Sequence, residues 1–190
     1  IQVAIDPSWL IVFFLVLWSL SAGYFPAQFP GRTWTAYIAV GFVSTLLFFA
    51  SVLIHELSHA FVGNSLGEEV RRITLFIFGG MAHLSGEPRS AGAEFKIAAV
   101  GPATSIGLGL LFLAVKALAA TAGVPDLWVA MFGYLGVINI ALAVFNLLPG
   151  YPLDGGRLLR AYFWSRSGNL RQATARAADW GTGIATGLMI

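Results

Sequence analysis

The sequence predicts an all-α polytopic membrane protein with about four complete transmembrane helices, the start of a fifth and a small β-hairpin at the cytoplasmic side. Of its 190 residues, 57% are hydrophobic and only 11% are charged, whereas a soluble domain carries about 25% charged residues. The apolar residues also gather in runs of the length, about 20 residues, that a spanning helix needs. This length and composition predict a single transmembrane domain over 1–190 and exclude an ordinary soluble globule.

The first two apolar runs lie at 8–25 and 34–62, on either side of a loop that holds Pro26, Pro30 and Gly31. The first run has no basic segment before it and no obvious cleavage site, so we interpret it as a span and not as a signal peptide. The second run contains a polar cluster, which is costly inside a bilayer and therefore indicates function.

A β-hairpin is predicted after the second span. Residues 73–78 are β-branched and aromatic, Gly79 and Gly80 follow, and 81–84 are again mostly apolar, a pattern typical of two short strands. We expect this hairpin to offer a free strand edge with which an unwound substrate segment pairs. The alternative is an amphipathic element that rests at the membrane interface.

Two further spans are predicted at 95–120 and 127–148, with a kink or break at Gly101-Pro102 in the first of them. Residues 101, 105 and 109 form a stripe of small side chains, which we interpret as close helix packing and not as part of a site. A polar, arginine-rich stretch follows at 154–176. The apolar run at 181–190 is too short to span, and we expect it to be the beginning of a fifth helix that this chain does not complete.

Orientation is predicted from the basic residues, because cytoplasmic loops carry an excess of Lys and Arg. With the N-terminus and the loops after spans two and four on one side, that side holds nine of the eleven Lys and Arg residues. The other side holds only Arg32 and Lys116. We therefore predict a multi-pass protein of the cell membrane whose second and fourth spans both end at the cytoplasmic face.

The chemistry is indicated by the HExxH motif formed by His55, Glu56 and His59. Residues four apart lie on one face of a helix, so both imidazoles can bind one zinc ion while Glu56 reaches a water on the metal. The alternative is a helix end where these side chains form hydrogen bonds to neighbouring helices. There is no cysteine, so thiolate ligands are excluded.

Zinc needs a third protein ligand, and the sequence offers several candidates. Asp154 belongs to the segment NLLPGYPLDGGR at 146–157, where two prolines force irregular backbone on the side of the membrane at which His59 lies. The alternative for Asp154 is a turn or a helix N-cap. The other candidate ligands are His83, Glu68, Glu69, Glu87 and Glu94.

The chain resembles the site-2 protease family of intramembrane zinc metalloproteases. The motifs HELSH at 55–59 and NLLPGYPLDGG at 146–156 carry this resemblance, with FGG at 78–80 and GPATS at 101–105 in support. The resemblance implies that His55, His59 and Asp154 bind one zinc ion per chain and that Glu56 is the general base. Members of this branch often continue into further helices and regulatory CBS domains, which lie outside this chain.

Two asparagines are candidates for contacts with the substrate or the transition state. Asn139 lies in the middle of the fourth span, and either an active-site role or an interhelical hydrogen bond explains an amide there. Asn146 matches the family motif, but it also lies just before the irregular segment, where freed backbone groups need partners. We favour the structural role for Asn146.

The predicted function is an intramembrane zinc endopeptidase that cuts in or near transmembrane segments of other membrane proteins. Its partners are then the bilayer and a transmembrane protein substrate, and its net charge of +2 indicates no nucleic acid. A homo-oligomer is compatible with the sequence but is not indicated by any motif. The alternatives are a membrane metalloprotease of another family that acts on soluble or lipidated substrates, a scaffold with a decayed site, and a non-proteolytic protein that binds or transports metal.

Overall fold

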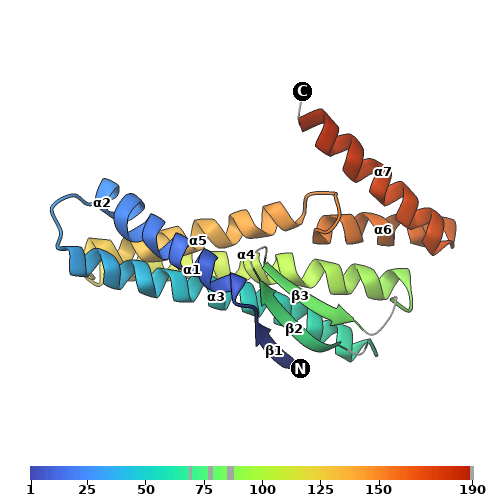
Figure 1. The fold of residues 1–190 in the computed structure, drawn as a ribbon, viewed down its shortest axis with the longest axis horizontal. Coiled ribbons are helices and arrows are strands. Elements are labelled where there is room, and N and C mark those ends of the chain that lie inside the picture. Colours follow the sequence, from blue (N-terminus) through green and yellow to red (C-terminus); the bar gives the residue numbers. More distant parts are fainter. Residues whose placement is uncertain (69, 77–78, 85–87, 189–190) are drawn as a thin grey trace.

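The computed structural model describes residues 1–68, 70–76, 79–84 and 88–188, which form a helical bundle with a small sheet against it (Figure 1). The elements follow one another as β1 (Gln2–Ile5), α1 (Ser8–Trp18), the π-helical η1 (Ser19–Tyr24), α2 (Phe25–Gln28), α3 (Trp34–Ser65), β2 (Val70–Phe76), β3 (Gly79–Leu84), α4 (Ala91–Thr121), α5 (Asp126–Asn146), α6 (Asp154–Ser167) and α7 (Leu170–Leu188).

The four predicted spans are confirmed. Within the described residues, four helical stretches are long and apolar enough to cross a membrane: Ser8–Gln28, Trp34–Ser65, Ala91–Thr121 and Asp126–Asn146. The first is built from α1, η1 and α2 in succession. The long helices α3, α4 and α5 lie alongside one another, with α1 across them (Figure 1).

The third span differs from its prediction because Pro102 does not break it. Helix α4 continues from Ala91 to Thr121 with Pro102 inside it. Packing against neighbouring helices tolerates a proline in a membrane helix, and here Pro102 is fully buried. Helix α5 ends at Asn146, two residues before the predicted limit, because a residue that precedes a proline, as Leu148 precedes Pro149, avoids the helical conformation.

The predicted hairpin is present as β2 and β3, which pair antiparallel. Gly79 and Gly80 lie in β3, opposite Phe76 and Leu75, so they do not form the turn, and residues 77–78 between the strands lie outside the described part. A third strand, β1, pairs parallel with β2 to give the order β1-β2-β3. The sequence analysis did not predict β1, because four residues have too little pattern to identify a strand whose partner lies near residue 72.

The C-terminal region contains two helices where the sequence predicted a polar stretch and the beginning of an apolar helix. Gly168 ends α6 in the left-handed conformation, with φ of 66°, which glycine adopts without steric cost. The Asn169 side chain then accepts a hydrogen bond from the Gln172 amide and caps the next helix. Helix α7 therefore begins at Leu170 and not at the apolar run, and it projects away from the bundle (Figure 1).

Within the described residues, the larger apolar core lies in the half of the bundle away from the polar motif. It joins η1, α2 and the first halves of α3 and α5 through Leu20, Phe25, Val40, Met131 and Leu135. Val40 precedes His55 by about four turns, or roughly 22 Å along the helix. The apolar half thus anchors α3 and α5, and the polar residues of α3 lie beyond it.

Candidate metal centre

Helix α3 brings His55 and His59 together on one face, as their spacing predicts. Their Nε2 atoms are 3.2 Å apart, and the two residues are only 2% and 5% exposed. The Ser58 hydroxyl donates to the His55 carbonyl at 2.6 Å and does not compete for the imidazoles. The two rings therefore present neighbouring nitrogen atoms to one buried point.

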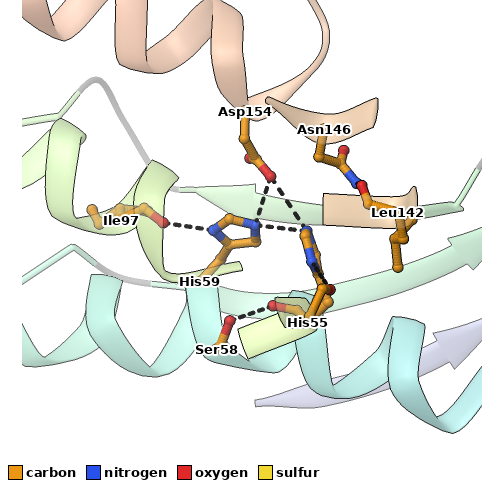
Figure 2. Close-up of polar contacts among 8 residues, drawn as sticks. His55, Ser58, His59, Ile97, Leu142, Asn146 and Asp154 are labelled. Carbon is orange, nitrogen blue, oxygen red and sulfur yellow. Dashed lines mark hydrogen bonds and ion pairs between the residues drawn. The ribbon is translucent and has the colours of Figure 1, made fainter. Parts of the chain in front are cut away.

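Asp154 reaches the same point from α6. Its Oδ2 atom lies 3.3 Å from His55 Nε2 and 3.2 Å from His59 Nε2 (Figure 2). It is the first residue of α6, and the N-cap position belongs to Leu153, so the N-cap alternative does not apply. Burial raises the pKa of Asp154, but the contacts with His55 and His59, when these rings carry the proton that faces Asp154, outweigh burial and lower the pKa to about 2. The carboxylate is therefore ionised at neutral pH.

Helix α4 orients both rings from the opposite side. His59 Nδ1 lies 2.6 Å from the Ile97 carbonyl oxygen (Figure 2), and because a carbonyl only accepts, Nδ1 is the donor. In the neutral ring, Nε2 then carries a lone pair that faces Asp154. His55 Nδ1 is 2.9 Å from the Ser105 hydroxyl. Metal-binding histidines usually engage their second nitrogen in this way, which fixes the ring orientation.

Gly101 of α4 leaves room for the two imidazoles. A Cβ atom at this position would lie 2.2 Å from His59 Nε2 and 2.7 Å from His55 Nε2, so no larger residue fits without moving the rings. The interpretation of 101, 105 and 109 as packing residues alone is therefore wrong for Gly101 and Ser105, which contact the histidines. It holds for Gly109, which approaches Ile140 and Gly136 of α5.

Three donor atoms from His55, His59 and Asp154 lie within 4.8 Å of one another. Two neutral imidazoles and a carboxylate form a donor set that suits zinc, which binds His nitrogen and Asp oxygen and keeps a fourth position for water at catalytic sites. A lone pair on His59 Nε2 that faces the Asp154 carboxylate is repelled unless a proton or a metal ion lies between the two groups. The residues present therefore fit a divalent metal ion.

Glu56 lies on the same turn of α3 as the histidines and is partly buried. It follows His55 directly in the sequence, and its charge interacts with those of His55, Asp154 and Arg157. No hydrogen bond joins the Glu56 side chain to any of the described residues. This carboxylate is thus available to act on a molecule bound at the site.

The two candidate asparagines are bonded within the bundle. Asn139 is fully buried, and its amide donates to the Leu135 carbonyl at 2.8 Å and to the Ser51 hydroxyl at 3.3 Å, which joins α5 to α3 one turn before His55. Its Oδ1 atom is buried without a hydrogen-bond partner. Asn146 donates to the Leu142 carbonyl at 3.0 Å (Figure 2).

The remaining candidate ligands do not join the group within the described residues. Glu68 accepts a hydrogen bond from the Arg89 amide, and Glu94 pairs with Arg160. Glu69, Glu87 and the side chain of His83 lie outside the described part of the chain. The sequence analysis missed the roles of Ile97 and Ser105 as partners of the histidines, although the GPATS motif, which contains Ser105, was a visible signal.

Comparison with known proteins places this site in a family. The sequence model described as "Peptidase family M50" matches residues 43–126 and 116–190. The chain is 40% identical over 180 residues to "Putative zinc metalloprotease sll0528" of Synechocystis, covering 95% of this chain and 46% of that protein. It is also 40% identical over 176 residues to "Putative zinc metalloprotease Rip3" of Mycobacterium tuberculosis, covering 93% and 44%. The chain thus spans a little under half the length of these relatives.

A solved structure has the same fold. The site-2 protease from Methanocaldococcus jannaschii superimposes with a TM-score of 0.60 at 28% sequence identity, covering 97% of this chain and 76% of that one. The fold is that of a membrane domain whose relatives are named zinc metalloproteases, and the donor set of the site fits zinc. The chain belongs to Peptidase family M50, the family of the site-2 proteases.

Proposed function

We propose that this chain is the catalytic core of an intramembrane zinc endopeptidase that cuts in or near transmembrane segments of membrane-protein substrates. The observation that carries the proposal is the convergence of His55, His59 and Asp154 beside a carboxylate, Glu56, that has no hydrogen-bond partner among the described residues. Two of the three ligands lie on a helix long and apolar enough to span a membrane, so the chemistry takes place at membrane depth.

His55, His59 and Asp154 are the proposed ligands of one zinc ion. When bound, zinc would lower the pKa of a coordinated water from 15.7 to about 7 and would polarise the scissile carbonyl as a Lewis acid. The protein supplies the geometry: Ile97 and Ser105 hold the rings, and α6 presents Asp154. With three protein ligands, a zinc ion held here would keep a fourth position for water.

Glu56 is the proposed general base and proton carrier. Its carboxylate takes the proton of the attacking water and passes it to the nitrogen of the leaving amine, which must be protonated for the peptide bond to break. This role needs a carboxylate that is close to the site but does not bind the metal. The position of Glu56, next to His55 on α3 and without a bonded partner, meets that requirement.

The substrate is proposed to be bound as an extended strand. A helical transmembrane segment keeps its carbonyls in internal hydrogen bonds, so it has to unwind before a peptide bond is accessible. Strand β3 lies at the edge of the sheet, with β2 on one side, and no other strand of the described residues pairs with its outer edge. Adding the substrate as a further strand would hold it extended near the site.

The active site is proposed to open toward the cytoplasm, in the cell membrane. Asp154 begins α6, and the arginines of α6 and α7 follow it, so the site lies at the end of the bundle that carries most of the basic residues. Nine of the eleven Lys and Arg residues belong to that side when the topology is drawn with four spans. A regulatory C-terminal domain outside this chain is part of the same proposal, since the relatives are about twice as long.

Zinc content and cleavage, measured on the same detergent-purified variants, test the proposal. We expect one zinc per chain in the wild type and loss of zinc in His55→Ala and His59→Ala, because two ligands remain. Asp154→Ala should weaken zinc binding, and Glu56→Gln should retain zinc while it loses cleavage of a transmembrane substrate by orders of magnitude.

Each departure from these expected results would contradict a different part of the proposal. A wild-type protein without zinc after reconstitution would overturn the metal site, and unchanged zinc affinity in Asp154→Ala would transfer the third-ligand role to another residue. Retained cleavage in Glu56→Gln would remove the general base. A metal-binding or transport protein would retain its zinc in Glu56→Gln and show no proteolysis even in the wild type.

A further inference from the structure

A buried ion pair joins α4 to the helix that carries Asp154. Glu94 of α4 is fully buried, and the side chain of Arg160 of α6 is only 17% exposed. Arg160 Nε donates to Glu94 Oε1 at 2.6 Å, and Nη2 donates to the same oxygen. Among the described residues, no other side-chain hydrogen bond or ion pair connects α4 with α6.

Apart from each other, the two buried charges have few polar partners. The second carboxylate oxygen of Glu94, Oε2, is buried without a hydrogen bond, and the Arg160 guanidinium lies 5.7 Å from the centre of the Tyr151 ring. Burying two charges costs several kcal/mol per ion, so such a pair is weak evidence for a gain in stability. A role in fixing the position of α6 relative to α4, and not in stability alone, explains why the two charges are buried here.

Helix α4 contacts both proposed histidine ligands and the helix that carries the third proposed ligand, Asp154. Glu94, Ile97, Gly101 and Ser105 follow at spacings of three and four and therefore share one face. On that face, Ile97 binds His59, Ser105 binds His55, and Gly101 lies against both rings. Glu94 completes the stripe by binding α6, the helix that presents Asp154.

The start of α6 also makes close backbone contacts with the segment before it. A Cβ atom on Gly155 would lie 2.3 Å from the carbonyl oxygens of Leu147 and Leu148, and one on Gly156 would lie 2.7 Å from the carbonyl carbon of Gly150. These contacts join α6 to the irregular residues 147–153. Helices α4 and α6 also pack directly against each other, and the Glu94–Arg160 pair adds a directional, charged contact to that packing.

We propose that Glu94 and Arg160 are positioning residues, which fix α6 on α4 and so set the distance of Asp154 from the two histidines. This inference rests on the proposed role of Asp154 as the third ligand. Arg160 lies six residues after Asp154, about 9 Å along the helix axis, so a shift of the rigid helix at Arg160 is carried to Asp154. A metal site tolerates only about 0.2 Å in its ligand distances.

Arg160→Lys tests the inference, because it keeps the charge but cannot reproduce the two donors of the guanidinium. We expect zinc affinity, measured by competition with a chelator, to fall roughly 10- to 100-fold, the range seen when a residue that orients a metal ligand is changed. The visible absorption spectrum of the cobalt-substituted protein should change in shape, which reports ligand geometry independently of activity.

Arg166→Lys is the matched control. Arg166 lies on the same helix, and its guanidinium is 5.6 Å from the centre of the Tyr162 ring, much as Arg160 lies by Tyr151. No ion pair joins it to the described residues. We expect wild-type zinc affinity and an unchanged cobalt spectrum in this variant, so a general effect of replacing arginine on α6 is separated from the effect at Arg160.

The double variant Glu94→Gln/Arg160→Gln covers the case in which Arg160→Lys fails to fold with Glu94 buried, because it removes both charges together. It should show a wild-type far-ultraviolet circular dichroism spectrum but weakened zinc binding and an altered cobalt spectrum. Wild-type affinity and spectrum in a folded Arg160→Lys or double variant would overturn the inference. If wild-type protein bound no zinc, or Asp154→Ala bound it unchanged, the proposed ligand set itself would be wrong.

Discussion

His55 and His59 each use one ring nitrogen to face Asp154 and the other to contact α4. The spacing of the two residues made the first arrangement predictable, because HExxH on a helix places both rings on one face. The second arrangement was not predictable, since the partners Ser105 and Ile97 are 50 and 38 residues away along the chain. Local patterns therefore point to candidate metal ligands, whereas the groups that orient them depend on tertiary packing.

Gly101→Ala should disrupt the site at the residue scale. The added Cβ would lie 2.2 Å from His59 Nε2, far inside van der Waals contact, so the imidazole or α4 has to move. We expect loss of most zinc binding and of cleavage, measured as zinc per chain and as turnover of a transmembrane substrate.

Gly107→Ala is the control for this variant. Gly107 lies on the same helix, and nothing lies within 4 Å of a Cβ placed on it, so the substitution adds the same atom without a clash. It should retain zinc and activity. Equal zinc content in the two variants would show that Gly101 is not in contact with the metal-binding rings in the working protein.

At the scale of elements, α4 and the sheet both pack against α3, and each contacts a different part of it. Helix α4 contacts the histidines and α6, while β2 packs on α3 through Val70, Ile73 and Ala60. The edge strand β3 also contacts α3, the helix that carries the HExxH motif. The sequence predicted the hairpin from its β-branched and aromatic residues, but not β1, which closes the opposite edge.

Hydrogen exchange tests whether β3 binds substrate. The Glu56→Gln variant avoids turnover, and the probe is a model transmembrane substrate added in detergent. We expect slower exchange in residues 79–84 with the substrate present, because the outward-facing amides of an edge strand gain partners.

Strand β1 at the other edge serves as an internal control, and its exchange should not change. Unchanged exchange in β3 at a substrate concentration that saturates binding would contradict the pairing. Protection that appears only in β1 would assign the substrate to the opposite edge of the sheet.

At the scale of the whole molecule, composition and apolar runs predicted the class and the four spans, because the bilayer imposes its length on every helix. What they did not predict is where a helix outside the four spans begins. Helix α7 begins at Leu170, before any apolar run, because the Asn169 cap and the left-handed Gly168 set its start. Hydropathy detects the lipid-facing part of a helix, whereas caps determine where the helix begins.

The distribution of basic residues predicts the orientation of the whole bundle, and the chain offers a clean way to measure it. It contains no cysteine, so single cysteines report their own position. Arg32 lies in the loop after the first span, and Arg166 lies on α6 after Asp154; both are exposed. In intact cells, a membrane-impermeant maleimide should label Arg32→Cys and should label Arg166→Cys only after the membrane is permeabilised.

The unsubstituted chain gives the background signal, which should be absent. The opposite labelling pattern would place the basic residues outside and would turn the metal centre toward the outer face. Labelling of both variants in intact cells would contradict the predicted number of spans between them. The expected pattern, with α6 inside, would mean that water reaches His55, His59 and Asp154 from the cytoplasm, because Asp154 lies at the beginning of α6.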